Sequence, residues 1–256
     1  MTKTAAKILL YDLEVSPNLG YAYGMWDTRI LKIKEYASIM SISWKWLGEE
    51  EVHHASLANI PRKRGSSSNK ALTKLIHQLF DEADIVVAHN AYKFDNRVAT
   101  AAFLRHGLTP PSPYKTVDTL RVARSQAMFP GGNSLDELGS YLGVGNKSAI
   151  TVRDLWFDCL RGDPTAWKLL EEYNNQDIVV LEGVYMKLLP YIKNHPNLGD
   201  MLQRDGVCPK CGSAHLQRRG FNTRRNGKVQ RYQCNNCGGW TNESKLNTRG
   251  RLVNAI

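Results

Sequence analysis

The segment Lys7–Pro17, KILLYDLEVSP, decides how the rest of the chain is interpreted. Its apolar run, Ile8–Tyr11, predicts a buried β-strand, and two carboxylates, Asp12 and Glu14, follow at its end. Because alternate residues of a strand point to the same face, both acids should project together from the end of a core element. Two negative charges held this close together beside a core repel each other unless a cation lies between them. We therefore expect this segment to supply half of a site for a hard divalent metal ion.

An isolated Asp-x-Glu pattern is weak evidence for such a site. Chance alone gives the pattern about half the time in a chain of this composition, and a solvated strand end is the alternative interpretation. The metal site therefore depends on further acids that the fold would bring to the same place.

The composition indicates a globular protein with a basic C-terminal part. The 256 residues, 42% apolar and 23% charged, are enough for one large domain with a core and a smaller unit. The formal net charge is +10, and the last 54 residues carry a surplus of nine positive charges, with Asp205 and Glu243 as their only acids. A basic module on a nearly neutral body predicts a polyanionic partner.

Hydropathy and cysteine usage predict a soluble protein of a reducing compartment. No apolar run approaches the roughly 20 residues that a spanning helix needs, so no membrane partner is expected. Acids at positions 12 and 14 argue against a signal peptide. Four of the five cysteines form two Cys-x-x-Cys pairs, which in a cytoplasmic setting indicate metal binding rather than disulfides.

The first third of the chain is rich in predicted strands. Alternating and aromatic-rich segments within Tyr21–Ser56 predict strands that continue from the first as an antiparallel meander. The segment 61–70, PRKRGSSSNK, predicts a flexible surface loop, and contact of its four cations with phosphates is the alternative.

The later part of the body alternates strands and helices. A capping box at Ser134 and Glu137 predicts one helix start. Apolar periodicity predicts a strand at 85–88 and helices at 71–80, 95–105 and 165–192. Strands followed by strand–helix alternation predict an α/β body with a mixed sheet.

Two further segments supply acids. Asn90–Asp95, NAYKFD, places an acid at a helix start after a buried strand, where functional groups often lie in α/β folds. Tyr173–Asp177, YNNQD, places a phenol and a carboxylate four residues apart on one face of the long helix. Chance would give Tyr-x-x-x-Asp about 0.6 times. The sequence contains the pattern three times, and only this copy lies in a predicted helix.

Taken in order, these segments resemble the three motifs of the DEDD superfamily of 3′-to-5′ exonucleases, in the subgroup that carries tyrosine. The motifs are Asp12-Leu-Glu14, Asn90-x-x-x-Phe94-Asp95 and Tyr173-x-x-x-Asp177, and the middle one is similar to that of family B DNA polymerase proofreading domains. VDTLRVAR at 117–124 and NSLDELGSYLGV at 133–144 resemble segments between the second and third motifs. The resemblance covers roughly residues 7–192 and implies a ribonuclease H-like mixed sheet flanked by helices. A noncatalytic globular domain is the alternative.

The resemblance also implies roles for the acids. Four carboxylates suit two Mg²⁺ or Mn²⁺ ions, which stabilise charge on the attacking and leaving oxygens of a phosphodiester. By resemblance, Asp12 bridges the two ions, Glu14 and Asp177 complete the site that holds the attacking water, and Asp95 lies on the leaving-group side. Tyr173 orients the water, because a phenol with a pKa near 10 is a poor general base at neutral pH.

The second motif is also expected to contact the substrate. The resemblance places Asn90 and Phe94 where the 3′-terminal nucleotides lie, with a core position as the alternative for Phe94. It gives Asp118 a structural position, so Asp118 is not expected to be a metal ligand.

The C-terminal cysteines have the spacing of two zinc knuckles. Cys208-Pro-Lys-Cys211 and Cys234-Asn-Asn-Cys237 are separated by 22 residues, and each pair precedes a glycine that permits a tight turn. Four thiolates at these positions predict one structural Zn²⁺ ion, and the segment resembles a zinc ribbon. A unit of this size has little core, so metal binding should supply much of its folding free energy.

Between the knuckles, cations alternate with aromatic residues in a predicted hairpin that turns at 225–227. Such a combination contacts phosphates and stacks on bases. A structural or protein-docking module is the alternative. The nucleic-acid-binding residues predicted here are Arg218, Arg219, Phe221, Arg224, Arg225, Lys228, Arg231 and Tyr232.

The sequence thus predicts a two-metal 3′-to-5′ exonuclease body at 1–195, a linker at 196–206 and a zinc ribbon with a basic hairpin and tail at 207–256. The expected partner is the 3′ end of single-stranded DNA or RNA, together with a replication or repair protein. The alternative is a nucleic-acid-binding or adaptor protein with a noncatalytic body and a protein-docking ribbon. The expected setting is the cytoplasm of a bacterial cell, and a bacteriophage origin would also suit so compact a form.

Overall fold

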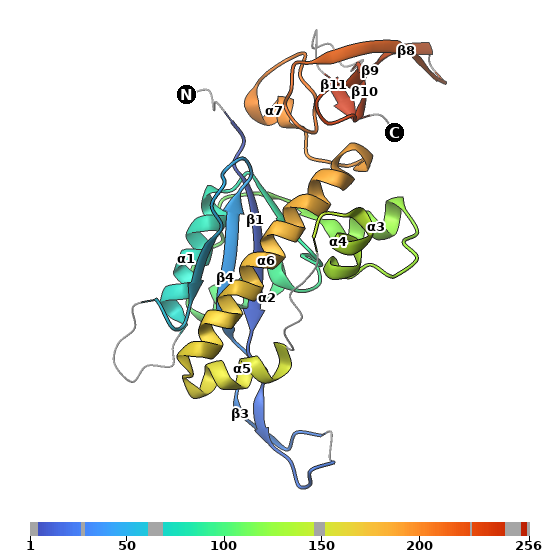
Figure 1. Ribbon diagram of the computed structural model, residues 1–256. Coiled ribbons are helices and arrows are strands. Elements are labelled where there is room, and N and C mark those ends of the chain that lie inside the picture. The colour runs from blue at the N-terminus through green and yellow to red at the C-terminus, as the bar shows by residue number, and fades with distance from the viewer. Residues whose placement is uncertain are drawn as a thin grey trace.

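The computed structural model (Figure 1) describes residues 5–26, 29–60, 69–145, 152–225, 227–243 and 252–254. The loop expected at 61–70 lies outside these ranges except for its last two residues. The turn expected at 225–227 lies outside them at residue 226, and the basic tail is described only at 252–254.

A five-stranded mixed sheet forms the centre of the body. Strand β1 pairs with β4 in antiparallel and with β6 in parallel register, and β7 runs parallel to β6. This arrangement confirms the α/β fold class predicted from the sequence. The strand order is β5 (His53–Ser56), β4 (Ile39–Trp46), β1 (Ile8–Val15), β6 (Ile85–Ala88) and β7 (Lys115–Asp118).

Helices cover both faces of this sheet because β1 is apolar on both sides. Ile8 and Leu10 pack into one buried cluster with side chains of α3, α4 and α6, while Leu9 and Leu13 pack into another with α1 and α2. Fully burying side chains of this size contributes about 1.5–3 kcal/mol each, so both layers stabilise the body. The helices are α1 (Lys70–Glu82) and α2 (Asp95–Arg105) on one face, and α3 (Thr119–Gln126), α4 (Leu135–Leu142) and α6 (Pro164–Leu188) on the other.

The long helix α6 crosses the sheet from α5 (Val152–Arg161) to the C-terminal part of the molecule (Figure 1). It begins where the Asp163 side chain accepts a hydrogen bond from the Thr165 amide and Pro164 occupies the first turn. It ends at Leu188, and a 3₁₀ turn, η1 (Leu189–Tyr191), replaces the last residues of the predicted helix. Pro190 explains the change, since it lacks the amide hydrogen that another α-helical turn would use.

The meander predicted from Tyr21 onwards is wrong for the described residues 21–26 and 29–35. Strands β2 (Leu19–Tyr21) and β3 (Lys32–Glu35) pair only with each other and project beyond the carboxyl end of β1 (Figure 1). The tip is exposed, with Tyr23 at 89%. A register shift between Glu14 and Val15, followed by Pro17, ends the pairing of β1 and lets the chain leave the sheet. β4 and β5 supply the expected antiparallel strands beside β1.

The C-terminal unit, residues 207–254, is a small antiparallel sheet that lies at the far end of α6 (Figure 1). Its strand order is β11 (Leu252–Asn254), β10 (Trp240–Glu243), β9 (Gly227–Cys234) and β8 (Leu216–Arg224).

The segment predicted as a linker, 196–206, contains a short helix, α7 (Leu198–Leu202), that contacts both parts. Leu198 is buried in the body cluster of α6, and its amide donates to the Pro209 carbonyl at 2.8 Å. The Tyr185 hydroxyl of α6 lies 2.8 Å from His195 Nε2. Among the described residues, no helix combines the length and apolar character that a membrane crossing requires.

Candidate active site

Three carboxylates meet where β1 passes under α6. Oxygen atoms of Asp12, Glu14 and Asp177 all lie within 4.8 Å of one another, and we call these residues the acid cluster. The period of a strand places Asp12 and Glu14 on the face of Ile8 and Leu10, which α6 covers. Glu14 and Asp177 are 7% and 4% exposed. Such a group of buried oxygens has the chemistry that Mg²⁺ or Mn²⁺ prefers.

Two hydrogen bonds hold the acid cluster in place. The Asn174 side chain donates to Asp12 Oδ2 at 2.7 Å, and the Trp156 indole donates to Glu14 Oε2 at 2.9 Å. Asn174 is fully buried, and its own oxygen accepts from Ser41 Oγ at 3.3 Å. The motifs do not predict either residue, although Asn174 stands within YNNQD beside Tyr173.

Asp95 lies beside the acid cluster and is 2% exposed at the start of α2. It is not part of the group whose oxygens lie within 4.8 Å. Burial raises the pKa of Asp95 to about 7, and hydrogen bonds from its own amide and that of Leu13 oppose this shift. The negative charges of Asp118 and Glu14 raise the pKa further. A bound cation would favour the charged form of this carboxyl group, so Asp95 fits a metal site.

Tyr173 lies on the buried side of α6, one turn before Asp177. It is 8% exposed, and the neighbouring Asn174 reaches Asp12 from the same side of the helix. The pair predicted from the Tyr-x-x-x-Asp spacing therefore faces β1 together.

The loop between β6 and α2 carries the second motif. Asn90 has a positive φ of 69°, which asparagine adopts more readily than most residues, and its carbonyl accepts the amides of Lys93 and Phe94 at 3.1 and 3.0 Å. Phe94 is 42% exposed, so the alternative of a core position is wrong. Its ring is available to a ligand.

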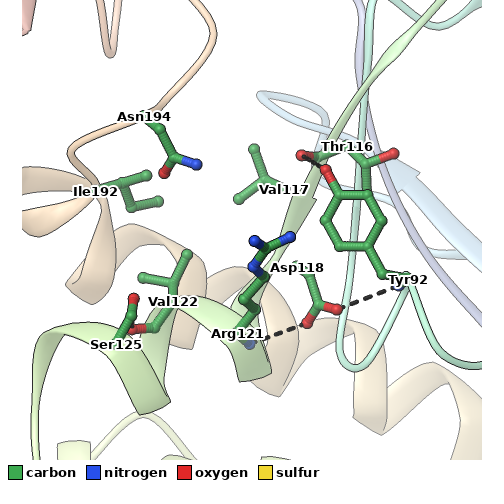
Figure 2. A pocket seen from close by; sticks show the side chains of 9 residues that line it. All are labelled: Tyr92, Thr116, Val117, Asp118, Arg121, Val122, Ser125, Ile192 and Asn194. Carbon is green, nitrogen blue, oxygen red and sulfur yellow. Dashed lines mark hydrogen bonds between the residues drawn. The ribbon is translucent and has the colours of Figure 1, made fainter.

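Asp118 has the structural role expected of it. Its carboxylate accepts the amides of Asn90 at 3.0 Å, Tyr92 at 3.2 Å and Arg121 at 3.2 Å, the last as the N-cap of α3. The latter two bonds are drawn in Figure 2. Asp118 thereby fixes the loop that leads to Asp95.

The four predicted cysteine ligands also come together. The distances are 3.7 Å between the sulfurs of Cys208 and Cys237 and 3.6 Å between those of Cys211 and Cys234, and all four sulfurs lie within 4.8 Å. A disulfide would require about 2.05 Å. Four ligands at about 2.3 Å around a tetrahedral zinc ion would be about 3.8 Å apart, so this cysteine cluster fits Zn²⁺.

The predicted nucleic-acid contacts divide into two groups. Arg231 packs over the Trp240 ring at 4.6 Å and donates to the Arg219 carbonyl, so its guanidinium helps to hold the sheet. Tyr232 is partly buried. The exposed group consists of Arg218, Arg219, Phe221, Arg224, Arg225 and Lys228.

Comparison with known proteins gives a family match and a structural match. A family model described as the RNase H superfamily matches residues 37–189. Among solved structures, the family B DNA polymerase from the hyperthermophilic archaeon Pyrobaculum calidifontis is similar, with a TM-score of 0.50 and 17% sequence identity. The match covers 73% of this chain but only 25% of the polymerase, so it indicates a shared fold over a quarter of that protein. A search of curated proteins gave no match.

Proposed function

Because the chain belongs to the RNase H superfamily, we propose that it is a metal-dependent 3′-to-5′ exonuclease acting on single-stranded nucleic acid. The observation that carries this proposal is the acid cluster, in which Asp12, Glu14 and Asp177 meet within 4.8 Å beside buried Asp95. Like charges buried this closely are costly without a cation, whereas divalent ions would make the arrangement favourable. The 3′-to-5′ polarity rests on the resemblance of the three motifs to those of the DEDD superfamily.

The bound ions would stabilise charge on the attacking and leaving oxygens and would acidify a water molecule. The chain's own residues position these groups. Asn174 and Trp156 fix one oxygen each of Asp12 and Glu14, so that the remaining oxygens keep their direction. Tyr173, buried beside Asp177, orients the attacking water by hydrogen bonding.

We further propose that the C-terminal unit is a zinc ribbon that increases affinity for nucleic acid. Sulfur distances of 3.6 and 3.7 Å support the zinc site. The exposed cations of β8 and β9, together with Phe221 at 62% exposure, support contact with phosphates and bases. Asn90 and Phe94 would contact the 3′-terminal nucleotides. A cytoplasmic setting and a replication or repair partner belong to the same proposal.

A noncatalytic body with a protein-docking ribbon is the alternative function. The exposed aromatic tip of the β2–β3 hairpin favours this alternative, because large exposed apolar groups often mark contacts with other proteins.

The decisive experiment follows the shortening of oligonucleotides labelled at either end. Single-stranded DNA and RNA are incubated with Mg²⁺, Mn²⁺ or a chelator. We expect loss of 3′-terminal nucleotides only with a metal ion. Asp12→Ala combined with Asp177→Ala should lower the rate at least about a thousandfold, since removing a group that stabilises developing charge costs about that much.

Glu172→Gln is the matched control, because Glu172 is an exposed acid on the same helix and should leave the rate unchanged. Equal degradation by wild type and the double variant would exclude this site as the nuclease centre. Binding without any metal-dependent shortening would favour the alternative.

A further inference from the structure

A second concave region lies at the carboxyl ends of β6 and β7. It is a hollow of about 390 Å³ whose lining includes Asn90, Lys93, Arg121 and Arg124. A smaller hollow of about 60 Å³ shares Tyr92, Asp118 and Arg121 with it (Figure 2). We call the larger one the arginine hollow. Ligands of open α/β sheets bind at this edge, where the strands end.

The arginine hollow is strongly cationic. Lys93, Arg121 and Arg124 are all exposed, and within the described part of the chain no carboxylate forms an ion pair with any of them. The one acid of the lining is Asp118, whose oxygens already accept three backbone amides. The three side chains are therefore available to an anion.

An aromatic ring is held against these cations. The Arg121 guanidinium lies 5.5 Å from the centroid of the Tyr92 ring. The Tyr92 hydroxyl donates to the Thr116 carbonyl at 3.1 Å, on the strand at the edge of the sheet, and the ring remains 46% exposed. A ring fixed at its hydroxyl end, with a guanidinium beside it, offers both a stacking surface and a phosphate contact.

The loop of the second motif connects the arginine hollow with the acid cluster. Asn90 and Lys93 line the hollow, and Asp95 follows at the start of α2, beside Glu14. An anionic polymer whose end reached the acid cluster would therefore continue along this edge.

We infer that the arginine hollow binds the phosphodiester backbone of the strand that is being shortened, a few nucleotides from its reacting end. Arg121 and Arg124 contact phosphates, and the Tyr92 ring stacks on a base. The inference rests on the proposed function, because it states where the substrate lies beyond the acid cluster.

The test measures the salt dependence of binding, which reflects how many phosphates the protein neutralises. A fluorescent single-stranded 12-mer is titrated with full-length Asp12→Ala protein, which should bind without degrading the strand. Removing the cation that neutralises one phosphate lowers the log–log slope by about 0.7, so Arg121→Ala with Arg124→Ala should lower it by about 1.4. At 0.1 M salt the same slope corresponds to binding that is about fivefold weaker for each cation removed.

Two control variants test whether the effect depends on the charge of these residues and on their position in the hollow. Arg121→Lys with Arg124→Lys should keep most of the slope, because binding to phosphates depends largely on charge. Arg105→Ala should keep all of it, because Arg105 is exposed at the opposite end of α2 from Asp95. Thermal melting checks that the double alanine variant is folded.

An unchanged slope in a folded double alanine variant would overturn the inference. A second result would also overturn it: a nucleoside monophosphate competes with the strand in the Asp12→Ala protein, but the double alanine variant binds the strand equally well and no longer binds the monophosphate. The hollow would then hold a free nucleotide. With Asp12 restored, the same two substitutions should raise KM for the 12-mer. If wild type shortens no strand with any metal ion, the proposed function fails, and the salt slope still decides whether the hollow binds nucleic acid.

Discussion

The acid cluster and the cysteine cluster are both suited to metal ions, but they are built in opposite ways. The acids come from β1 and α6, and Glu14 and Asp177 are 163 positions apart in the sequence. The cysteines come from two tight Cys-x-x-Cys turns within 30 residues. The first site depends on the folding of the whole body, whereas the second is nearly complete in the local sequence.

The two surroundings differ as much as the ligands. Buried apolar residues fill both faces of the body sheet, whereas Val207 and Val229 are the main aliphatic side chains buried in the described part of the C-terminal unit. The body can therefore assemble its acids without an ion. We expect the C-terminal unit to need a bound ion to fold, since a core this small does not offset the chain entropy.

The largest expected effect is the unfolding of the C-terminal unit when its ion is removed. Cys208→Ser with Cys237→Ser should remove zinc and about 10 kcal/mol of folding free energy from this unit, while the body melts as before. Zinc content and limited proteolysis measure the two effects. Cys159→Ser is the control, because Cys159 is buried in the body and should not affect zinc content. A double variant that kept one zinc ion would contradict the assignment of ligands.

A smaller effect is expected where a neighbour orients an acid. Trp156→Phe removes the indole hydrogen bond to Glu14, and a bond to a charged group contributes about 1.5–3 kcal/mol. The exonuclease rate should fall about tenfold or more at saturating metal. Trp167→Phe is the matched control, since Trp167 packs against the same small core cluster. Equal rates in the two variants would show that the acid cluster does not depend on this bond.

The smallest expected effect is a pH dependence of the body. Burial lowers the pKa of His54 to about 4, and its Nδ1 lies 2.9 Å from Ser43 Oγ, which donates to Asn175. The folded state therefore binds fewer protons at His54 than the unfolded state, so the contribution of His54 to stability should fall as the pH drops from about 6.5 to about 4. The raised pKa of Asp95 contributes in the opposite direction, so the prediction concerns the difference between wild type and a His54 variant. With allowance for the remaining solvent exposure, the decrease should be about 1–2 kcal/mol.

Denaturant titrations at several pH values measure this decrease. His54→Gln should remove this contribution, and a zinc chelator should leave it unchanged, because His54 belongs to the body. Parallel pH curves for wild type and His54→Gln would contradict this explanation.

The parts predictable from the sequence are those with a local pattern. The apolar run Ile8–Tyr11 predicts the central strand, the capping box predicts the start of α4, and the two Cys-x-x-Cys turns predict the cysteine cluster. Asp12 and Asp177 form no local pattern together. Their meeting follows from the order of the motifs and the predicted fold.

The residues that escape prediction act across long separations or in ambiguous segments. Asn174 reaches Asp12 across 162 positions and Trp156 reaches Glu14 across 142, so neither leaves a repeating signal. The aromatic alternation around Tyr21 is the same whether a strand joins the main sheet or projects from it. Helix α7 is only five residues long, too short to produce a helical period.

Helix α6 runs from the acid cluster to the C-terminal unit that carries the cysteine cluster. Tyr173 and Asp177 lie on it near the acids, and Tyr185 on the same helix contacts His195 at the entrance to the C-terminal unit. Eight residues of α-helix separate Asp177 from Tyr185, a rise of about 12 Å along a stiff rod. Because Lys210 of the C-terminal unit donates to the Pro190 carbonyl just beyond α6, and His195 contacts Tyr185, we expect that transferring this unit to another protein would require the last turns of α6 as well.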